Sequence, residues 1–338
     1  MLNLTDDMRA ALSAGRHDEA LAKVQAEFRA RLSRTHRFPN SVAARLLLFF
    51  YLCFLLAGGG IARLFHRTRP DRLLVRLSNY YAAVPEMTLH KAIELRSLAK
   101  RAYVGQGLDL GCGDGIVGGM LIEEAGLTDL HGVDISPVEP ESIMANGYVG
   151  YTVADIQRLP EHGDATFDYV VSICVIEHVP DLDAVLTQAA RVLKPGGVFY
   201  FTTPSPSYHD GLFLPKLLRG VGLKERANDF NTFKDLQSCH HHYLSQNEWI
   251  SLLKSHGFAD VEVEPIFSRG QLMAYDLLNA QVYLSSFYFY PHLLRWVGRF
   301  SVLKKAVSWA TAELCGWIAN VSASKANHTH FNIACRKT

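Results

Sequence analysis

The chain has 338 residues, which exceeds the usual size of a single domain and leaves room for one large domain with additions. Its formal net charge is only +1, and no alternation of aromatic and basic residues suggests a nucleic-acid groove, which argues against a polyanion as the main partner. The six cysteines form no CxxC pair, a pattern typical of reduced, mostly buried thiols in a protein facing the cytosol.

Residues 5–34 are predicted to form two short helices separated by Gly15. One such helical hairpin cannot bury its own apolar face, and the sequence contains no second copy of it. We therefore expect 1–40 to be a helical hairpin that docks on the rest of the chain or on a partner.

A run of 17 uncharged, mostly apolar residues follows at 46–62, and the stretch 28–70 around it holds eight arginines and no acidic residue. The run is shorter than the ~20 residues of a full membrane span and too uniformly apolar for an amphipathic surface helix. Because arginine favours cytoplasmic loops, we expect the segment 41–84 to contain a re-entrant or in-plane hydrophobic helix with both ends on the cytoplasmic side. The alternative is a core helix that the rest of the chain buries.

The stretch LDLGCGDG at 108–115 predicts the end of a buried strand, then a sharp turn that opens a helix beneath a ligand. Gly113, Gly115 and Gly118 also satisfy the GxGxxG spacing of dinucleotide sites. Asp109 favours another cofactor, because a carboxylate just before the first glycine opposes a pyrophosphate. The same carboxylate suits the ammonium and sulfonium groups of S-adenosylmethionine.

Acidic residues end two further predicted strands. Asp134 in LHGVDIS lies where such folds hold a cofactor ribose through its hydroxyls, and Asp155 in ADIQRLP follows a third strand. FDYVVSICVIEHV (167–179) supplies a fourth strand, and ARVLKPGGVFYFTTP (190–204) supplies a helix, a turn and a fifth strand. This order and spacing are consistent with an α/β sheet.

The C-terminal third is predicted to complete the sheet around an insertion. A capped helix at 246–255 precedes a sixth strand at 259–266, and a seventh strand is expected at 330–337. Between these strands, an insertion at 268–327 contains the uncharged, aromatic run 277–294. Aromatic residues mixed with cations favour a membrane interface, while the alternative is a helical cap that packs on the sheet or dimerises.

The sequence Cys239 to His242, CHHH, offers good zinc ligands, but consecutive residues rarely all converge on one ion. We favour roles in a substrate pocket or in local structure, with one histidine as a second-choice base. The preceding segment 204–238 is expected to form a lid on the methyl-acceptor side.

The motifs LDLGCGDG, EHV (177–179) and LKPGG (193–197) together resemble the class I S-adenosylmethionine-dependent methyltransferases, in particular the type 11 or ubiquinone-methyltransferase-like group. The resemblance covers roughly residues 85–265 and the last ten residues. It implies a Rossmann-like seven-stranded sheet in 85–338 whose last hairpin is antiparallel. The N-terminal helices and the helical insertion before the last strand are additions to that fold.

The resemblance also implies how S-adenosylmethionine is bound. It puts Asp109, Gly111 and Gly113 around the methionine part, Asp134 on the ribose, and Asp155 beside the adenine. The complete predicted cofactor-binding set is Asp109, Gly111, Cys112, Gly113, Asp134, Ile135, Asp155, Ile156 and Ile173.

Methyl transfer needs mainly a nucleophile held near the methyl carbon with water excluded, and a base only for weakly acidic acceptors. Glu177 and His178 are the predicted catalytic residues, because they follow the fourth strand at the mouth of the sheet. Related ubiquinone O-methyltransferases help to hold a divalent metal with a carboxylate three residues earlier. Cys174 occupies that position here, so we predict no metal site.

We expect an enzyme that O-methylates an apolar or lipid-linked small molecule, such as an isoprenoid quinone, as a peripheral or monotopic protein on the cytoplasmic side of a membrane. N- or C-methylation of a similar acceptor is the first alternative. A non-catalytic interaction module of the same fold is the second, against which the intact acidic strand ends argue. No nucleic-acid partner is expected.

Overall fold

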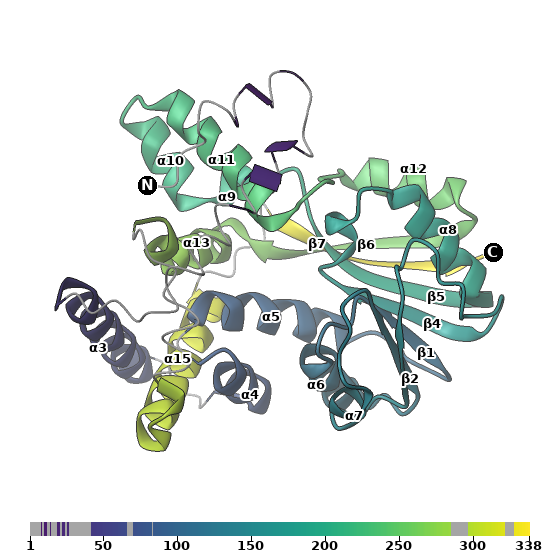
Figure 1. The fold of residues 1–338 in the computed structure, drawn as a ribbon, viewed down its shortest axis with the longest axis horizontal. Helices are drawn as coiled ribbons and strands as arrows, with labels where there is room; N and C mark the ends of the chain where they lie inside the picture. The colour runs from purple at the N-terminus through teal and green to yellow at the C-terminus, as the bar shows by residue number, and fades with distance from the viewer. Residues whose placement is uncertain are drawn as a thin grey trace. The chain divides into compact units, whose positions relative to one another are not determined.

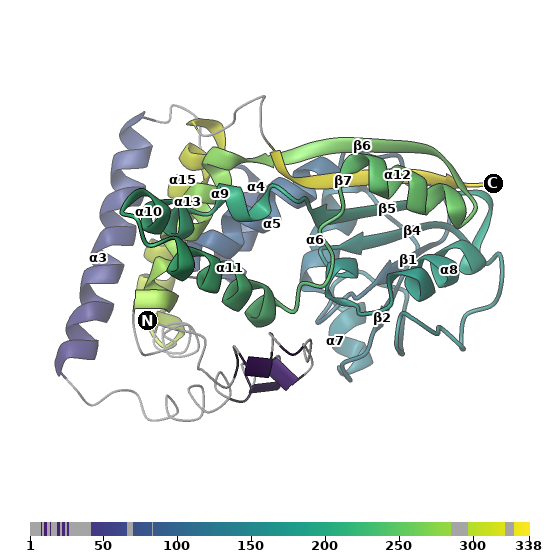
Figure 2. The same cartoon turned by 90° about the horizontal axis from the view of Figure 1, so that it is seen from above.

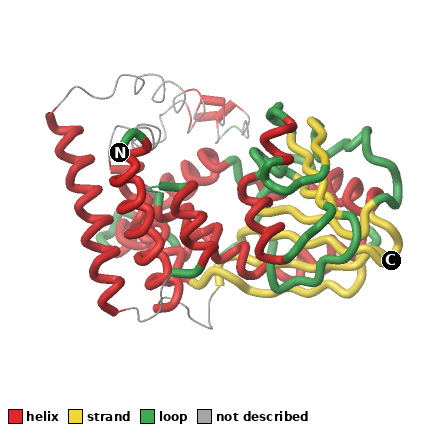
Figure 3. The backbone as a smooth tube through the Cα atoms, turned by 90° about the horizontal axis from the view of Figure 1, so that it is seen from below, coloured by secondary structure: helices red, strands yellow, loops and turns green. Residues whose placement is uncertain are grey.

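The computed structural model describes residues 42–65, 70–82, 84–284, 297–321 and 328–338, together with single positions between 8 and 26. The chain forms two compact units, each built from three segments of sequence. The first, here called the helical unit, comprises Met1–Ala92, His209–Cys239 and Ser268–Lys325. The second, the sheet unit, comprises Ile93–Tyr208, His240–Phe267 and Ala326–Thr338. Figure 3 shows that the strands gather in the sheet unit and that the described helical unit is made of helices.

Seven strands form one sheet in the order β3-β2-β1-β4-β5-β7-β6 (Figures 1 and 2). The first five pair in parallel, and β7 pairs antiparallel with β5. The predicted seven-stranded sheet with an antiparallel last strand is therefore confirmed. The strands are β1 Gly107–Leu110, β2 Leu130–Asp134, β3 Gly150–Val153, β4 Phe167–Ile173, β5 Leu193–Pro204, β6 Phe258–Ser268 and β7 His328–Lys337.

The strand order reverses at β1, which pairs with β2 on one side and with β4 on the other. Asp109 of β1 lies opposite Gly132 of β2 and Val171 of β4. In open α/β sheets the crevice outside the carboxyl ends of the strands at such a reversal is where ligands bind. This edge is where the glycine turn follows β1 and where β4 leads to Glu177.

Helices cover both faces of the sheet. Figure 1 shows α8 and α12 on one face and α6 on the other. Leu108 and Leu110 share a buried apolar cluster with Val185 of α8 and Trp249 of α12. Because side chains alternate along a strand, Asp109 between them faces the opposite side, that of α6. The helices of this unit are α6 Ile116–Ala125, α7 Pro140–Met144, the short 3₁₀ helix η1 Ile176–His178, α8 Leu182–Val192 and α12 Gln246–Ser255.

The start of α12 follows the prediction from sequence. Ser245 accepts a hydrogen bond from the backbone N–H of Glu248, and the Glu248 carboxylate accepts one from the N–H of Ser245. This capping box satisfies two of the N–H groups that a helix leaves unpaired at its start. It fixes where the helix begins after the histidine-rich segment.

The helical unit is organised around α15, which packs along α3 and against α4. Its helices are α3 Val42–Phe65, α4 Arg72–Tyr80, α10 Phe213–Gly220, α11 Lys224–Ser238, α13 Arg269–Leu284 and α15 Ser301–Val321, while α5 Pro85–Leu98 and α9 Tyr208–Gly211 have residues in both units. Of the predicted insertion, 269–284 and 301–321 are helical. The hairpin predicted at 5–34 and the stretch 285–294 lie largely outside the described residues, so both stay predictions.

The apolar run at 46–62 lies in α3, whose two faces differ. Leu52, Leu55 and Ala62 are buried, and a Cβ on Gly59 would collide with the backbone of Ala310 in α15. The two helices therefore approach closely at a glycine. In the described part of the chain, no helix is both long enough and apolar enough to cross a membrane.

The contact at Gly59 gives a matched pair of substitutions. Gly59→Ala should destabilise the protein by about 1–3 kcal/mol, because α3 and α15 must separate to admit the methyl group. Gly60→Ala has open space around its new Cβ and should stabilise the protein by up to about 1 kcal/mol through helix propensity. Thermal unfolding followed by circular dichroism measures both. Equal effects of the two substitutions would contradict the close approach.

Candidate functional site

The turn after β1 contains three positions whose backbone conformation favours glycine. Gly111, Gly113 and Gly115 have φ angles of +80°, +57° and +75°, which side-chain-bearing residues rarely adopt. The N–H groups of Gly111 and Cys112 donate to the carbonyl of Val133 at 2.8 and 3.1 Å, which fixes the turn against β2. Nothing lies within 4 Å of the position that a Cβ on Gly113 would take. The backbone there is open to a ligand.

Asp134 at the end of β2 joins this turn to the next. Its Oδ2 accepts from the N–H of Gly113 at 2.9 Å, and its Oδ1 accepts from the N–H of Ser136 at 2.8 Å. A carboxylate oxygen can accept more than one hydrogen bond, so both oxygens retain capacity for ribose hydroxyls. The next residue, Ile135, is 70% exposed, an unusual position for a large apolar side chain and one that suits stacking on an adenine ring.

Asp109 has a partner that the sequence did not indicate. It is buried, and its Oδ2 accepts from the hydroxyl of Tyr148 at 2.6 Å. A Cβ on Gly118 would coincide with that hydroxyl, so the glycine in α6 makes the contact possible. Burial and the nearby Asp109 raise the pKa of Tyr148, which keeps its O–H a donor. The predicted contact of Asp109 with the methionine part of the cofactor stays a prediction.

The other predicted cofactor residues differ in what their side chains do. The side chain of Cys112 packs over Gly132, burial raises the pKa of its thiol, and Ile156 lies in the buried apolar cluster of the sheet. Asp155 accepts from the backbone and side-chain N–H groups of Gln157, and Ile173 is buried at the end of β4. The side chains of Cys112 and Ile156 are thus engaged in packing, and any contact with a cofactor would come from their backbone.

S-adenosylmethionine needs space beside the backbone, acceptors for its ribose hydroxyls and an apolar surface for its adenine. The backbone at Gly113 offers open space, the carboxylate of Asp134 beside it offers hydroxyl acceptors, and the exposed Ile135 offers an apolar face. The residues therefore fit this cofactor. The predicted contacts themselves stay predictions.

The turn after β4 holds Glu177 in a buried position. Cys174 has φ +58°, a strained conformation for a residue with a side chain, and its Sγ donates to Glu177 Oε1 at 2.7 Å. Burial raises the pKa of Glu177 above its usual range, while His178 and the Cys174 hydrogen bond lower it. Among the residues that the structure describes, Glu177 Oε2 has no hydrogen-bond partner. A buried oxygen of this kind is suited to a ligand hydroxyl or a water.

His178 follows Glu177 on the same turn and is partly accessible, with its side chain 35% exposed. Its Nε2 lies 3.8 Å from Glu177 Oε1. The histidine-rich segment packs on this turn, because His241 donates its N–H to the carbonyl of Glu177 at 2.8 Å and His242 Nε2 donates to that of Val179 at 2.8 Å. The ring centroid of His240 lies 4.9 Å from that of His178. The sequence predicted a role near the substrate for these histidines but not these contacts.

The two turns contact one another directly. A Cβ on Gly111 would lie 2.5 Å from Cγ1 of Val175, so the Val175 side chain fills the space beside the glycine. The structure therefore brings the predicted cofactor turn and the predicted catalytic turn together at the carboxyl edge of β1 and β4.

The thiol of Cys174, the carboxylate of Glu177 and the imidazole of His178 offer ligand atoms within 4.8 Å of one another. Thiolate, carboxylate and imidazole are all zinc ligands, and such a set can hold a metal only if the thiol loses the proton that it donates to Glu177 here. The predicted lack of a metal site stays a prediction.

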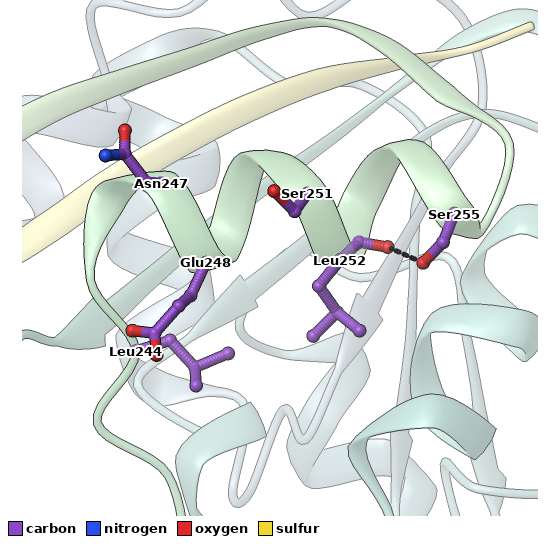
Figure 4. A pocket seen from close by; sticks show the side chains of 6 residues that line it. All are labelled: Leu244, Asn247, Glu248, Ser251, Leu252 and Ser255. Carbon is purple, nitrogen blue, oxygen red and sulfur yellow. Dashed lines mark hydrogen bonds between the residues drawn. The ribbon is translucent and has the colours of Figure 1, made fainter.

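The sheet unit also contains a pocket away from the two turns. It has a volume of about 530 Å³ and runs along α12 (Figure 4). None of the predicted site residues lines it; the lining residues are Leu244, Asn247, Glu248, Ser251, Leu252 and Ser255.

Comparisons with known proteins give a family match and several relatives. Residues 82–263 match the family described as "Methyltransferase domain". The chain is 30% identical over 201 residues to an arsenite methyltransferase of Aquipseudomonas alcaligenes, covering 54% of this chain and 53% of that protein. It is 35% identical over 106 residues to the human mitochondrial ubiquinone biosynthesis O-methyltransferase, covering 28% of each. The chain thus spans about half, or less, of the length of these relatives.

Among solved structures, the chain is similar to phosphoethanolamine N-methyltransferase 2 of Haemonchus contortus in complex with S-adenosyl-L-methionine. The sequences are 22% identical, the TM-score is 0.41, and the match covers 73% of this chain and 52% of that one.

The cofactor geometry predicts the effect of removing the Asp134 carboxylate. Asp134→Ala should weaken S-adenosylmethionine binding at least tenfold, because it removes charged hydrogen-bond acceptors worth about 1.5–3 kcal/mol. Isothermal titration calorimetry measures the affinity, and Glu161→Ala, an exposed acid outside the two turns, is the control. Unchanged affinity in a folded Asp134→Ala protein, or tight binding of a nicotinamide dinucleotide, would refute this assignment.

Proposed function

The chain belongs to the class I S-adenosylmethionine-dependent methyltransferases, and from that premise we propose that it transfers a methyl group to an oxygen of an apolar or lipid-linked small molecule at the cytoplasmic face of a membrane. The observation that carries the chemical part is the packing of Val175 on Gly111, which joins the glycine turn to the turn of Glu177 and His178. A base held beside a methyl-donor site is what transfer to a weakly acidic hydroxyl requires.

S-adenosylmethionine supplies an electrophilic methyl group when bound. The glycine turn and Asp134 would hold it. His178, the more accessible of the pair, accepts the proton of the acceptor hydroxyl. The Glu177 carboxylate stabilises the resulting imidazolium across the 3.8 Å that separates the two groups.

Oxygen is proposed as the methylated atom because the unpartnered Oε2 of Glu177 and the adjacent imidazole suit a hydroxyl. The activity named for the human relative, an O-methyltransferase, supports the same choice. The arsenite methyltransferase acts on a different acceptor by its name, so the relatives do not agree on a substrate. Methylation of nitrogen or carbon would need less of a base and would tolerate the loss of His178. A non-catalytic module would bind the cofactor without turnover.

The pH dependence of methyl transfer tests this arrangement. Activity requires ionised Glu177, so it should fall as the pH drops through the pKa of that group. Cys174→Ala removes a hydrogen bond that lowers the pKa of Glu177, so the acidic limb of the profile of kcat/KM should move to higher pH. Cys174→Ser keeps a donor and is the matched control.

His178→Ala should lower turnover by ~10²–10⁴ with cofactor affinity nearly intact.

The acceptor for these assays is found by mass spectrometry of lipids from cells with and without the chain. A Cys174→Ala profile that does not move would contradict the role of Glu177. Wild-type turnover in His178→Ala would favour a nitrogen or carbon acceptor. Loss of turnover on adding a chelator would contradict the predicted lack of a metal.

Membrane association is proposed from the exposed face of α3. Opposite the residues packed on α15, this helix exposes large apolar side chains that are 49% to 82% accessible: Leu46, Phe49, Phe50, Phe54, Ile61, Leu64 and Phe65. Exposed apolar patches of this kind mark protein or membrane contacts, and the arginine-rich, acid-free sequence around α3 suits anionic lipid headgroups.

Vesicle flotation tests the exposed face. The full chain should float with vesicles of phosphatidylcholine and phosphatidylglycerol even in about 1 M NaCl, which screens charges beyond about 3 Å but leaves apolar burial intact. Phe50→Glu with Phe54→Glu should reduce binding at least tenfold, because each buried phenylalanine contributes about 1.5–3 kcal/mol. Val104→Glu with Val149→Glu places the same charges on exposed apolar positions elsewhere and should float normally. A wild-type protein that stays with the unbound fraction would favour a dimer or a partner on this face.

A further inference from the structure

The helical unit contains a pocket of about 370 Å³ that none of the predicted site residues lines. Asp210, Lys216 and Arg219 line it from α9 and α10, and Arg269 and Met273 line it from the first turns of α13. Three cations and one carboxylate thus face a single concavity. The local net charge is +2, since three positive charges exceed one negative charge by two.

The walls of the pocket are fixed to one another. α10 packs against α13, and the N–H of Leu214 donates to Oδ2 of the buried Asp276 at 2.9 Å. A hydrogen bond to a carboxylate is among the stronger ones in proteins, and burial protects it from competition by water. The cations are therefore carried on a preformed surface, which lowers the entropy lost on binding a ligand.

The acid in the pocket offsets only part of the positive charge. Asp210 Oδ2 lies 3.6 Å from Nη2 of Arg269, while Nη2 of Arg219 donates to the neutral amide of Asn228 at 3.4 Å. Over the part of the chain that the structure describes, no carboxylate lies within ion-pair distance of Lys216 or Arg219. Two cations are thus available to an anion with two charges, the state of a phosphate monoester near neutral pH.

Apolar side chains continue from the pocket along both of its helices. Met273 is part of the wall and partly exposed, and Leu277 lies one turn further along α13 with 54% of its surface accessible. Leu217 is exposed on α10, beside Lys216. Cations at one end and apolar side chains beyond them match a ligand with a charged head and a hydrocarbon tail.

We propose that this pocket binds the phosphate monoester headgroup of an amphiphile. Lys216 and Arg219 pair with the phosphate oxygens, Arg269 adds a forked donor, and Met273 and Leu277 contact the first part of the hydrocarbon chain. This binding is separate from methyl transfer and from the exposed face of α3, because it uses none of the residues assigned to cofactor binding, to catalysis or to that face.

Calorimetry on the full chain tests the proposal with two soluble probes. Dihexanoyl phosphatidic acid carries head and tail, while glycerol 3-phosphate carries the head alone. The first should bind at least tenfold more tightly than the second. Lys216→Gln with Arg219→Gln should weaken its binding at least tenfold, whereas Lys224→Gln with Arg226→Gln, which removes two exposed cations of α11 outside the pocket, should change it less than twofold. Asp210→Asn removes the competing carboxylate and should tighten binding.

Titration of each variant with S-adenosylmethionine checks that the variant is folded. This check needs no turnover, so the test still decides the proposal if the proposed methyl transfer fails. Equal affinity for the two probes would overturn the amphiphile and leave a simple phosphate monoester as the ligand. Equal losses in the two double variants would overturn the pocket, because the attraction would then be a general effect of charge. Failure of both probes to bind would overturn the proposal as a whole.

Discussion

The contact of Val175 with Gly111 is the constraint on which the site depends, because it allows two turns from different strands to occupy adjoining space. Any side chain at Gly111 would separate the turns. The strained backbone of Cys174 lies next to this contact, and such strain persists only where its surroundings hold it. Here the hydrogen bond from Cys174 to Glu177 and the one from His241 to the Glu177 carbonyl hold it in place. Packing, backbone strain and a buried acid are thus parts of one local arrangement.

Much of the sheet could be predicted from sequence because its signals are local. Three features show this: the glycine turn, the acids at strand ends and the capping box of α12. Each of them is a pattern of residues only a few positions apart. The antiparallel last strand is a different case. The antiparallel direction of this strand was expected from the resemblance to a family and is confirmed by its pairing with β5. The position of β7 between β5 and β6 was not predicted.

The site was less accessible to sequence reasoning because its contacts join distant residues. Tyr148 and Asp109 are 39 positions apart, and no sequence pattern around the tyrosine predicts their hydrogen bond. The histidines at 240–242 are visible as a cluster in the sequence, but their hydrogen bonds to the carbonyls of Glu177 and Val179 depend on tertiary packing. The helical unit is assembled from three separated segments, and the sequence did not predict which of them pack together. Helix periodicity shows which face of a helix is apolar but not what covers that face.

The ends of the segment between β6 and β7 meet inside the sheet unit. Thr329 at the start of β7 donates its hydroxyl to the carbonyl of Phe267 at the end of β6, at 2.8 Å. About sixty residues therefore leave and re-enter the sheet at one point, as a domain inserted in a loop does. The entropic cost of closing a loop grows only slowly with its length, so the stability of the sheet should depend little on how long this segment is. Evolution can lengthen, shorten or replace α13 and α15 while the strands that carry the cofactor turn keep their pairing.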